Sequence, residues 1–82
     1  MLNWMVPMDE AVVIQVGSGL RTARLRAGLT TAQVAEAACL PPEAYVRMER
    51  GKLLPTVSTL VALCRALRIR AEWLRRTPAA AH

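Results

Sequence analysis

Residues 28–51 decide the fold of this chain, and they read GLTTAQVAEAACLPPEAYVRMERG. Gly28 suits the left-handed residue that ends a preceding helix, because glycine has no Cβ to clash in that conformation. Thr30 can cap the next helix with its hydroxyl, and Gln33 stands where a capping box needs it. A helix is therefore expected over about 31–38.

Pro41 and Pro42 mark the start of a second helix, because proline fits the first helical turn but not the interior. This helix is expected over about 42–50, with Gly51 ending it. Two short helices joined by a tight turn are the layout of a DNA-reading helix-turn-helix, whose second helix presents polar side chains to base edges. Here that helix opens with Pro41-Pro42-Glu43-Ala44, which offers no side-chain donor to a base.

A long helix is expected before this unit, over 9–27. Apolar or small residues recur there at spacings of three and four, which places them on one helical face: Val12, Val16, Leu20, Ala23 and Ala27. The β-branched run at 12–14 and the glycines at 17 and 19 favour a helix less. A short strand at 11–16 therefore stays open as an alternative.

Two further helices are expected after the unit. Pro55 restarts the chain, and an apolar stripe predicts a helix over about 56–67, formed by Val57, Leu60, Val61, Cys64 and Leu67. Ile69 anchors a last short helix together with Trp73 and Leu74. The expected fold is thus all-α, with five helices and no required sheet.

The domain plan follows from these elements. At 82 residues the chain is long enough for one domain with a single modest core. We expect an irregular N-terminal arm over 1–8, the helix-turn-helix domain over 9–76 and a flexible C-terminal tail over 77–82. The apolar residues expected to close the two central helices on the flanking ones are Val34, Leu40, Tyr45 and Met48.

The formal net charge is +5, which indicates an anionic partner such as nucleic acid, although a solvated basic surface explains it equally well. Residues 1–64 hold six basic and five acidic side chains, whereas residues 65–82 hold five basic and one acidic. Most of the excess charge therefore lies outside the helix-turn-helix.

Several classes of function are not expected. Cys39 and Cys64 lack the CxxC spacing and the single histidine, His82, is terminal, so no metal, cofactor or enzymatic centre is predicted. No apolar run reaches the roughly 18 residues of a membrane span, and the start of the chain lacks a secretory signal. A cytoplasmic protein without a small-molecule ligand is expected.

From residue 16 to about residue 74 the chain resembles the Xre/Cro/lambda-repressor-like helix-turn-helix family. The matching pieces are Leu20-Arg21, Arg24, Gly28-Leu29-Thr30, Val34-Ala35, Met48-Glu49-Arg50-Gly51-Lys52, Pro55 and Leu60. The resemblance implies a small homodimeric repressor or autoregulator that binds double-stranded DNA at a palindromic operator. Its two recognition helices would enter major grooves about 34 Å apart.

The resemblance places base contacts on Pro42, Glu43, Ala44 and Arg47. Of these, only Arg47 can make the bidentate contact to guanine. Glu43 could accept a hydrogen bond from cytosine, but it also lies four residues before Arg47, where an intrahelical ion pair would hold Arg47 back. Arg47 is therefore the main predicted base reader.

Phosphate contacts are implied for Thr31, Arg50 and Lys52, assisted by helix-terminal N–H groups. A plain capping role for Thr31 and solvated surface charges for the other two stay open. The resemblance also implies a partly buried ion pair between Arg24 and Glu49.

Cys39 stands where the family usually has glycine, so the turn between the two helices could be remodelled. Relatives often use the segment that holds Trp73 and Leu74 for dimer contacts, which makes both candidate interface residues. The alternative function is a helix-turn-helix scaffold used as a protein-interaction module. It would use the basic segment 65–76 and the N-terminal arm against an acidic protein partner.

Overall fold

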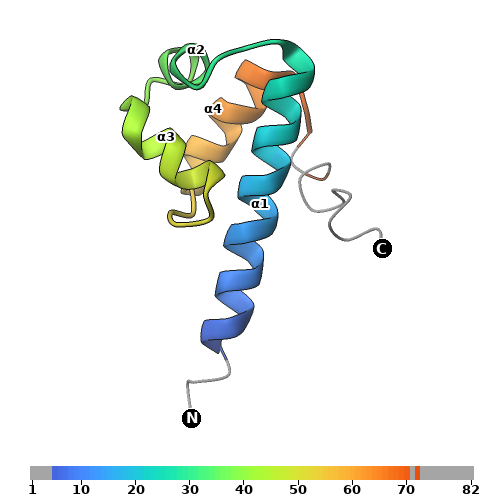
Figure 1. The fold of residues 1–82 in the computed structure, drawn as a ribbon, viewed down its shortest axis with the longest axis vertical. Coiled ribbons are helices and arrows are strands. Elements are labelled where there is room, and N and C mark those ends of the chain that lie inside the picture. Colours follow the sequence, from blue (N-terminus) through green and yellow to red (C-terminus); the bar gives the residue numbers. More distant parts are fainter. Residues whose placement is uncertain (1–4, 71, 73–82) are drawn as a thin grey trace.

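The structure, a computed structural model, describes residues 5–70 and 72. Within that part of the chain there are four α-helices and no strand, so the predicted all-α class is confirmed. The helices are α1 (Met5–Ala27), α2 (Thr31–Ala37), α3 (Pro42–Glu49) and α4 (Val57–Leu67). Figure 1 shows α2, α3 and α4 gathered around the C-terminal half of α1, whose N-terminal turns extend beyond them.

Helix α1 begins at Met5, earlier than the start at Asp9 that the periodicity predicted. Residues 5–8 of the expected irregular arm are therefore helical, while residues 1–4 lie outside the described residues. Pro7 is compatible with this start, because the N–H groups of a first turn have no intrahelical acceptor to lose. The alternative of a strand at 11–16 is wrong, since these residues continue α1.

Most of the predicted fifth helix lies outside the described residues. Ile69, its first expected residue, follows α4 and packs half-buried against the core. Trp73, Leu74 and the expected tail at 77–82 lie outside the described residues. No helix in the described part of the chain has the length and apolarity needed to cross a bilayer.

All four helices contribute to one hydrophobic core. Three of the predicted core residues, Val34, Tyr45 and Met48, are buried, and Leu40 packs half-buried against them. The other buried members are Leu20, Ala23, Ala35, Ala38, Leu63, Cys64 and Leu67. Each fully buried leucine or valine contributes about 1.5–3 kcal/mol to folding, so this cluster fixes how α3 is held.

A glycine lets α1 contact the backbone of α3. A Cβ placed on Gly17 would collide with the carbonyl oxygen of Met48 and would lie 2.8 Å from that of Glu49. The glycine that the sequence presented as a weakness of the helix is thus required by a close crossing. The C-terminal end of α3 is held against the middle of α1.

The four helices end in the same way. Each is followed by a residue in the left-handed region, with φ of 72° at Gly28 and Gly51 and 59° at Cys39 and Arg68. The N–H of the next residue then donates to a carbonyl five positions earlier, at 2.8–3.2 Å: Leu29 to Arg24, Leu40 to Ala35, Lys52 to Arg47 and Ile69 to Cys64. Glycine adopts this conformation freely, whereas Cys39 and Arg68 do so at a cost of roughly 1–2 kcal/mol each.

Candidate nucleic-acid interface

The capping box at the start of α2 is formed as predicted. The backbone N–H of Gln33 donates to Thr30 Oγ1 at 3.0 Å, and the Thr30 N–H donates to Gln33 Oε1 at 2.9 Å. Thr31 is the first residue of α2 and is half-buried. Because Thr30 and Gln33 supply the cap, the Thr31 hydroxyl is not needed for that purpose.

The turn between α2 and α3 keeps its left-handed residue although that residue is a cysteine. Cys39 has φ of 59° and is exposed, so the turn keeps its left-handed conformation and the strain lies at Cys39. Pro41 then serves as the N-cap of α3 without a side-chain hydrogen bond, and its carbonyl accepts from the N–H groups of Ala44 and Tyr45 at 3.0 and 3.3 Å. The proline pair starts the helix, as the sequence predicted.

Helix α3 divides into a buried face and an exposed face. Tyr45 and Met48 point into the core, whereas the exposed residues are Pro42, Glu43 and Arg47. Ala44 is half-buried, so of the four predicted base-contact residues it offers the least surface. The exposed face thus carries one cation and one carboxylate.

The intrahelical ion pair expected between Glu43 and Arg47 is not formed. Among the described residues, the salt bridge of the structure joins Arg24 and Glu49 instead, and both Glu43 and Arg47 are exposed. The guanidinium of Arg47 is consequently not held by a carboxylate. This removes the main obstacle that the sequence raised against base reading by this residue.

Two more cations lie beside Arg47 where α3 ends. Arg50 is the C-cap of α3, Lys52 follows Gly51, and both are exposed. The Lys52 N–H donates to the carbonyl of Arg47 at 2.9 Å, which brings the two residues into the same turn. Arg47, Arg50 and Lys52 are therefore three exposed cations within six positions at the C-terminal end of the recognition helix.

Arg24 neutralises the Glu49 carboxylate, which lies between Arg47 and Arg50 in the sequence. Its Nε donates to Glu49 Oε2 at 2.6 Å and its Nη2 to Oε1 at 3.1 Å, while Nη1 donates to the Leu29 carbonyl at 3.1 Å. The Arg24 and Glu49 side chains are 14% and 8% exposed. The hydrogen bond to Glu49 is the main reason that the pKa of Arg24 is raised above its ordinary value.

Tyr45 adds a feature that sequence reasoning missed. Its side chain is fully buried, and its hydroxyl has no hydrogen-bond partner among the described residues. Burial raises the pKa of this phenol well above its ordinary value, and the nearby Glu49 carboxylate raises it further. Only the apolar spacing of Tyr45 was readable from the sequence, not the position of its hydroxyl beside the ion pair.

The chain belongs to the helix-turn-helix family of the Xre/lambda-repressor type, because the family model described as helix-turn-helix matches residues 20–74. The fold is similar to that of the restriction-modification controller C.AhdI from Aeromonas hydrophila. That similarity has 26% identity and a TM-score of 0.74, and it covers 78% of this chain and 97% of the other. No curated protein matches the chain.

A second similar structure is the clp gene regulator ClgR from Corynebacterium glutamicum. It is 26% identical, with a TM-score of 0.79 over 85% of this chain and 91% of that chain. The restriction-modification controller C.Esp1396I, at 18% identity and a TM-score of 0.71 over 79% of this chain and 86% of the other, shares the fold.

Proposed function

We propose that this helix-turn-helix protein is a transcriptional regulator that reads double-stranded DNA with α3 in the major groove. The observation that carries the proposal is the Arg47 side chain, which is exposed on α3, close in sequence to Arg50 and Lys52, and has no ion-pair partner among residues 5–70 and 72. A free guanidinium is the side chain best suited to a bidentate contact with guanine O6 and N7. The similarity to C.AhdI and ClgR supports the same role.

Each predicted contact residue has a distinct part in this proposal. Arg47 is the main base reader, Glu43 accepts from a cytosine amino group, and Pro42 and Ala44 provide apolar surface for a thymine methyl. Thr31, Arg50 and Lys52 contact phosphates and fix the position of α3 in the groove. Phosphate contacts supply most of the affinity, and Arg47 supplies most of the discrimination.

The proposed regulator acts in the cytoplasm as a homodimer on a roughly palindromic operator. Two copies of α3 about 34 Å apart would enter successive major grooves on one side of the duplex. We assign the dimer contacts to Trp73 and Leu74, as the resemblance implies.

A binding titration over several salt concentrations tests the proposal. The preferred duplex is first selected from a random library, and its affinity is then compared with that of a scrambled duplex of equal length. A specific regulator binds the selected site at least about a thousandfold more tightly, and the affinity falls steeply with salt. Equal affinity for both duplexes at every salt concentration would refute specific reading.

The second candidate is a helix-turn-helix module that binds an acidic protein instead of DNA. It is favoured by the Pro-Pro-Glu-Ala opening of α3, which leaves only Arg47 as a base donor on the exposed face. The same titration separates the two candidates, because a protein module binds every duplex weakly and without sequence preference.

A further inference from the structure

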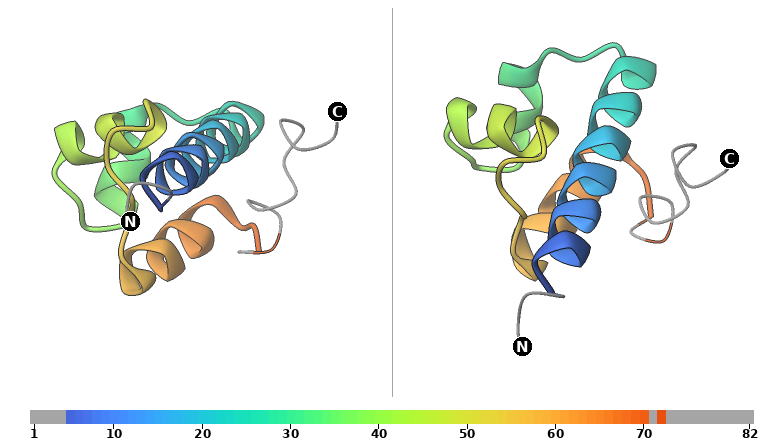
Figure 2. Two further views of the ribbon diagram at one scale, coloured as in Figure 1. Left: turned by 90° about the horizontal axis from the view of Figure 1, so that it is seen from below. Right: turned by 60° about the horizontal axis from the view of Figure 1, so that its bottom comes forward.

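A groove of about 480 Å³ runs along α4, outside the helix-turn-helix. Its lining combines two arginines, Arg65 and Arg68, with five apolar side chains: Val57, Leu60, Val61, Cys64 and Ile69. We call this surface the α4 groove. Figure 2 shows α3 and α4 on different sides of α1, and the groove shares no residue with the proposed DNA contacts.

The apolar lining is open to solvent along much of the groove. Val57 is 80% exposed and Val61 is 46% exposed, while Leu60 and Ile69 are half-buried. On α4, which has eleven residues and is about 16 Å long, the apolar residues Val57, Val61 and Cys64 are spaced by four and three positions, and Ile69 follows the end of the helix. A partner helix laid along α4 would meet this stripe with side chains of the same spacing.

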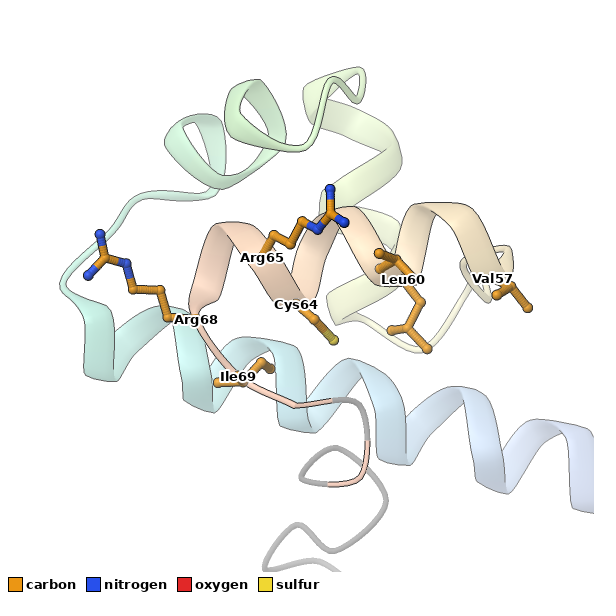
Figure 3. Close-up of a pocket in the computed structure, with 7 residues that line it drawn as sticks. Val57, Leu60, Cys64, Arg65, Arg68 and Ile69 are labelled. Carbon is orange, nitrogen blue, oxygen red and sulfur yellow. The ribbon is translucent and has the colours of Figure 1, made fainter.

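The charges of the groove all have one sign. Arg65 and Arg68 are exposed and have no ion-pair partner among the described residues, and α4 contains no aspartate or glutamate. Figure 3 shows Leu60, Cys64 and Ile69 on the side of α4 nearer α1, Arg65 pointing away from α1, and Arg68 at the C-terminal end of α4. The groove therefore has an apolar floor and a cationic rim.

We propose that the α4 groove binds an acidic amphipathic helix of a partner protein. The apolar face of that helix would cover Val57 and Val61, and its carboxylates would pair with Arg65 and Arg68. Charged pairs at a rim set specificity and the association rate, while the buried apolar anchors supply most of the affinity.

Charge disfavours a second copy of this chain in the groove, and the open shape disfavours a small ligand. A second copy of this chain seated groove to groove with the two-fold axis near Arg65 would bring the cations of both copies together, and α4 has no carboxylate to pair with them. A small ligand needs most of its surface enclosed, whereas Val57 at the end of the groove is 80% exposed. An elongated acidic helix satisfies both the open shape and the charge.

The proposal is tested with the full chain and a fluorescent synthetic helix of about 15 residues, a length that can hold helical structure. The probe carries leucine at spacings of three and four and glutamate elsewhere. The matched control probe has lysine in place of every glutamate. Anisotropy titrations give both affinities, and we expect the acidic probe to bind at least about tenfold more tightly.

Two substitutions localise the binding to the groove. Val61→Asp and Arg65→Glu should each weaken the acidic probe by about tenfold or more. The matched controls are Val12→Asp, at a site that is 48% exposed on α1, and Arg50→Glu, which makes the same charge change on the DNA side. Both controls should leave probe affinity unchanged, and circular dichroism checks that every variant is folded.

DNA distinguishes this proposal from the proposed function. Arg50→Glu should weaken DNA binding and leave probe binding unchanged. Val61→Asp should weaken probe binding and leave DNA binding unchanged. Competition between a DNA duplex and the probe would overturn the proposal, because it would place the probe on α3. Equal affinity for the acidic and basic probes would overturn the proposal as well. So would a molecular mass of Val61→Asp, measured by light scattering, that is half that of the unsubstituted protein, because the groove would then be an interface between two copies of this chain.

Discussion

Arg24 and Glu49 are 25 positions apart in the chain and meet in a two-point ion pair that ties α1 to the end of α3. The same arginine also holds the Leu29 carbonyl in the connection between α1 and α2. One side chain therefore links three elements, and the position of the recognition helix depends on it.

We expect Glu49→Gln to lower the free energy of unfolding by about 3–5 kcal/mol, because it leaves the nearly buried Arg24 guanidinium without its counter-charge. Urea denaturation followed by circular dichroism measures the change. Glu36→Gln, at an exposed position on α2, is the matched control and should stay within about 0.5 kcal/mol. A loss below about 1 kcal/mol for Glu49→Gln would mean that the pair behaves as a surface salt bridge.

We expect Tyr45→Phe to raise the free energy of unfolding by about 1 kcal/mol near pH 7, because it removes a buried hydroxyl that has no hydrogen-bond partner among the described residues. A decrease of similar size would show instead that the hydroxyl makes a stabilising contact with Glu49 or Arg24. Urea denaturation of the two proteins in the same buffer decides the sign.

The alkaline pH dependence follows from two raised pKa values. Burial raises the pKa of the Tyr45 phenol above 10.0 and that of the Cys64 thiol above 9.0, so the unfolded chain loses these protons first. The contribution of these two groups to stability is then constant below about pH 8 and falls above pH 9 to 10, by up to about 1.4 kcal/mol per pH unit for each group. The double variant Tyr45→Phe, Cys64→Ala should lose most of this slope.

We expect Gly17→Ala to destabilise the fold by about 1–3 kcal/mol, although alanine is the better helix former. The added Cβ meets backbone carbonyls of Met48 and Glu49, which cannot rotate away as a side chain could. Ser18→Ala, exposed on the same helix, is the control and should be neutral or slightly stabilising. If Gly17→Ala were stabilising, the close crossing of α1 and α3 would not hold in solution.

We expect Cys39→Gly to stabilise the protein by up to about 1 kcal/mol. The substitution relieves the left-handed strain at φ of 59°, and the extra freedom of glycine in the unfolded chain offsets only part of the gain. Ala37→Gly, two residues earlier and still helical, should destabilise by roughly 0.5–1 kcal/mol. Thermal denaturation of both variants should therefore show shifts of opposite sign.

We expect Arg47→Ala to cost about 1–3 kcal/mol of binding on the selected DNA site and little on scrambled DNA. Lys52→Ala should weaken binding to both duplexes equally. It should also reduce the slope of log affinity against log salt concentration by about one. Titrations at several salt concentrations measure both effects. An equal loss on both duplexes for Arg47→Ala would make it a phosphate contact.

The helix boundaries were predictable because local chemistry sets them. Gly28 and Gly51 take the left-handed conformation, and Thr30 with Gln33 closes the capping box, all within a few residues of sequence. The predicted start of α1 was wrong because Pro7 was interpreted as part of an irregular arm, although proline is tolerated in the first turn of a helix.

The site was less predictable because it depends on contacts between distant segments. Gly17 is explained only by the end of α3, and the Tyr45 hydroxyl only by its place beside Glu49. The expected pairing of Glu43 with Arg47 was a local rule that the structure does not follow. Spacing along one helix indicates which side chains can form an ion pair, but a pair between two exposed side chains contributes little to the free energy of folding.

The two faces of α3 give this protein a separable design. The residues that hold the helix in place, Tyr45, Met48 and Glu49, lie apart from the exposed Glu43 and Arg47. Target preference can therefore drift or be re-engineered at the outer positions while the scaffold stays intact. In a library randomised at Glu43 and Arg47, nearly all variants should fold, and their DNA sequence preference should be free to change.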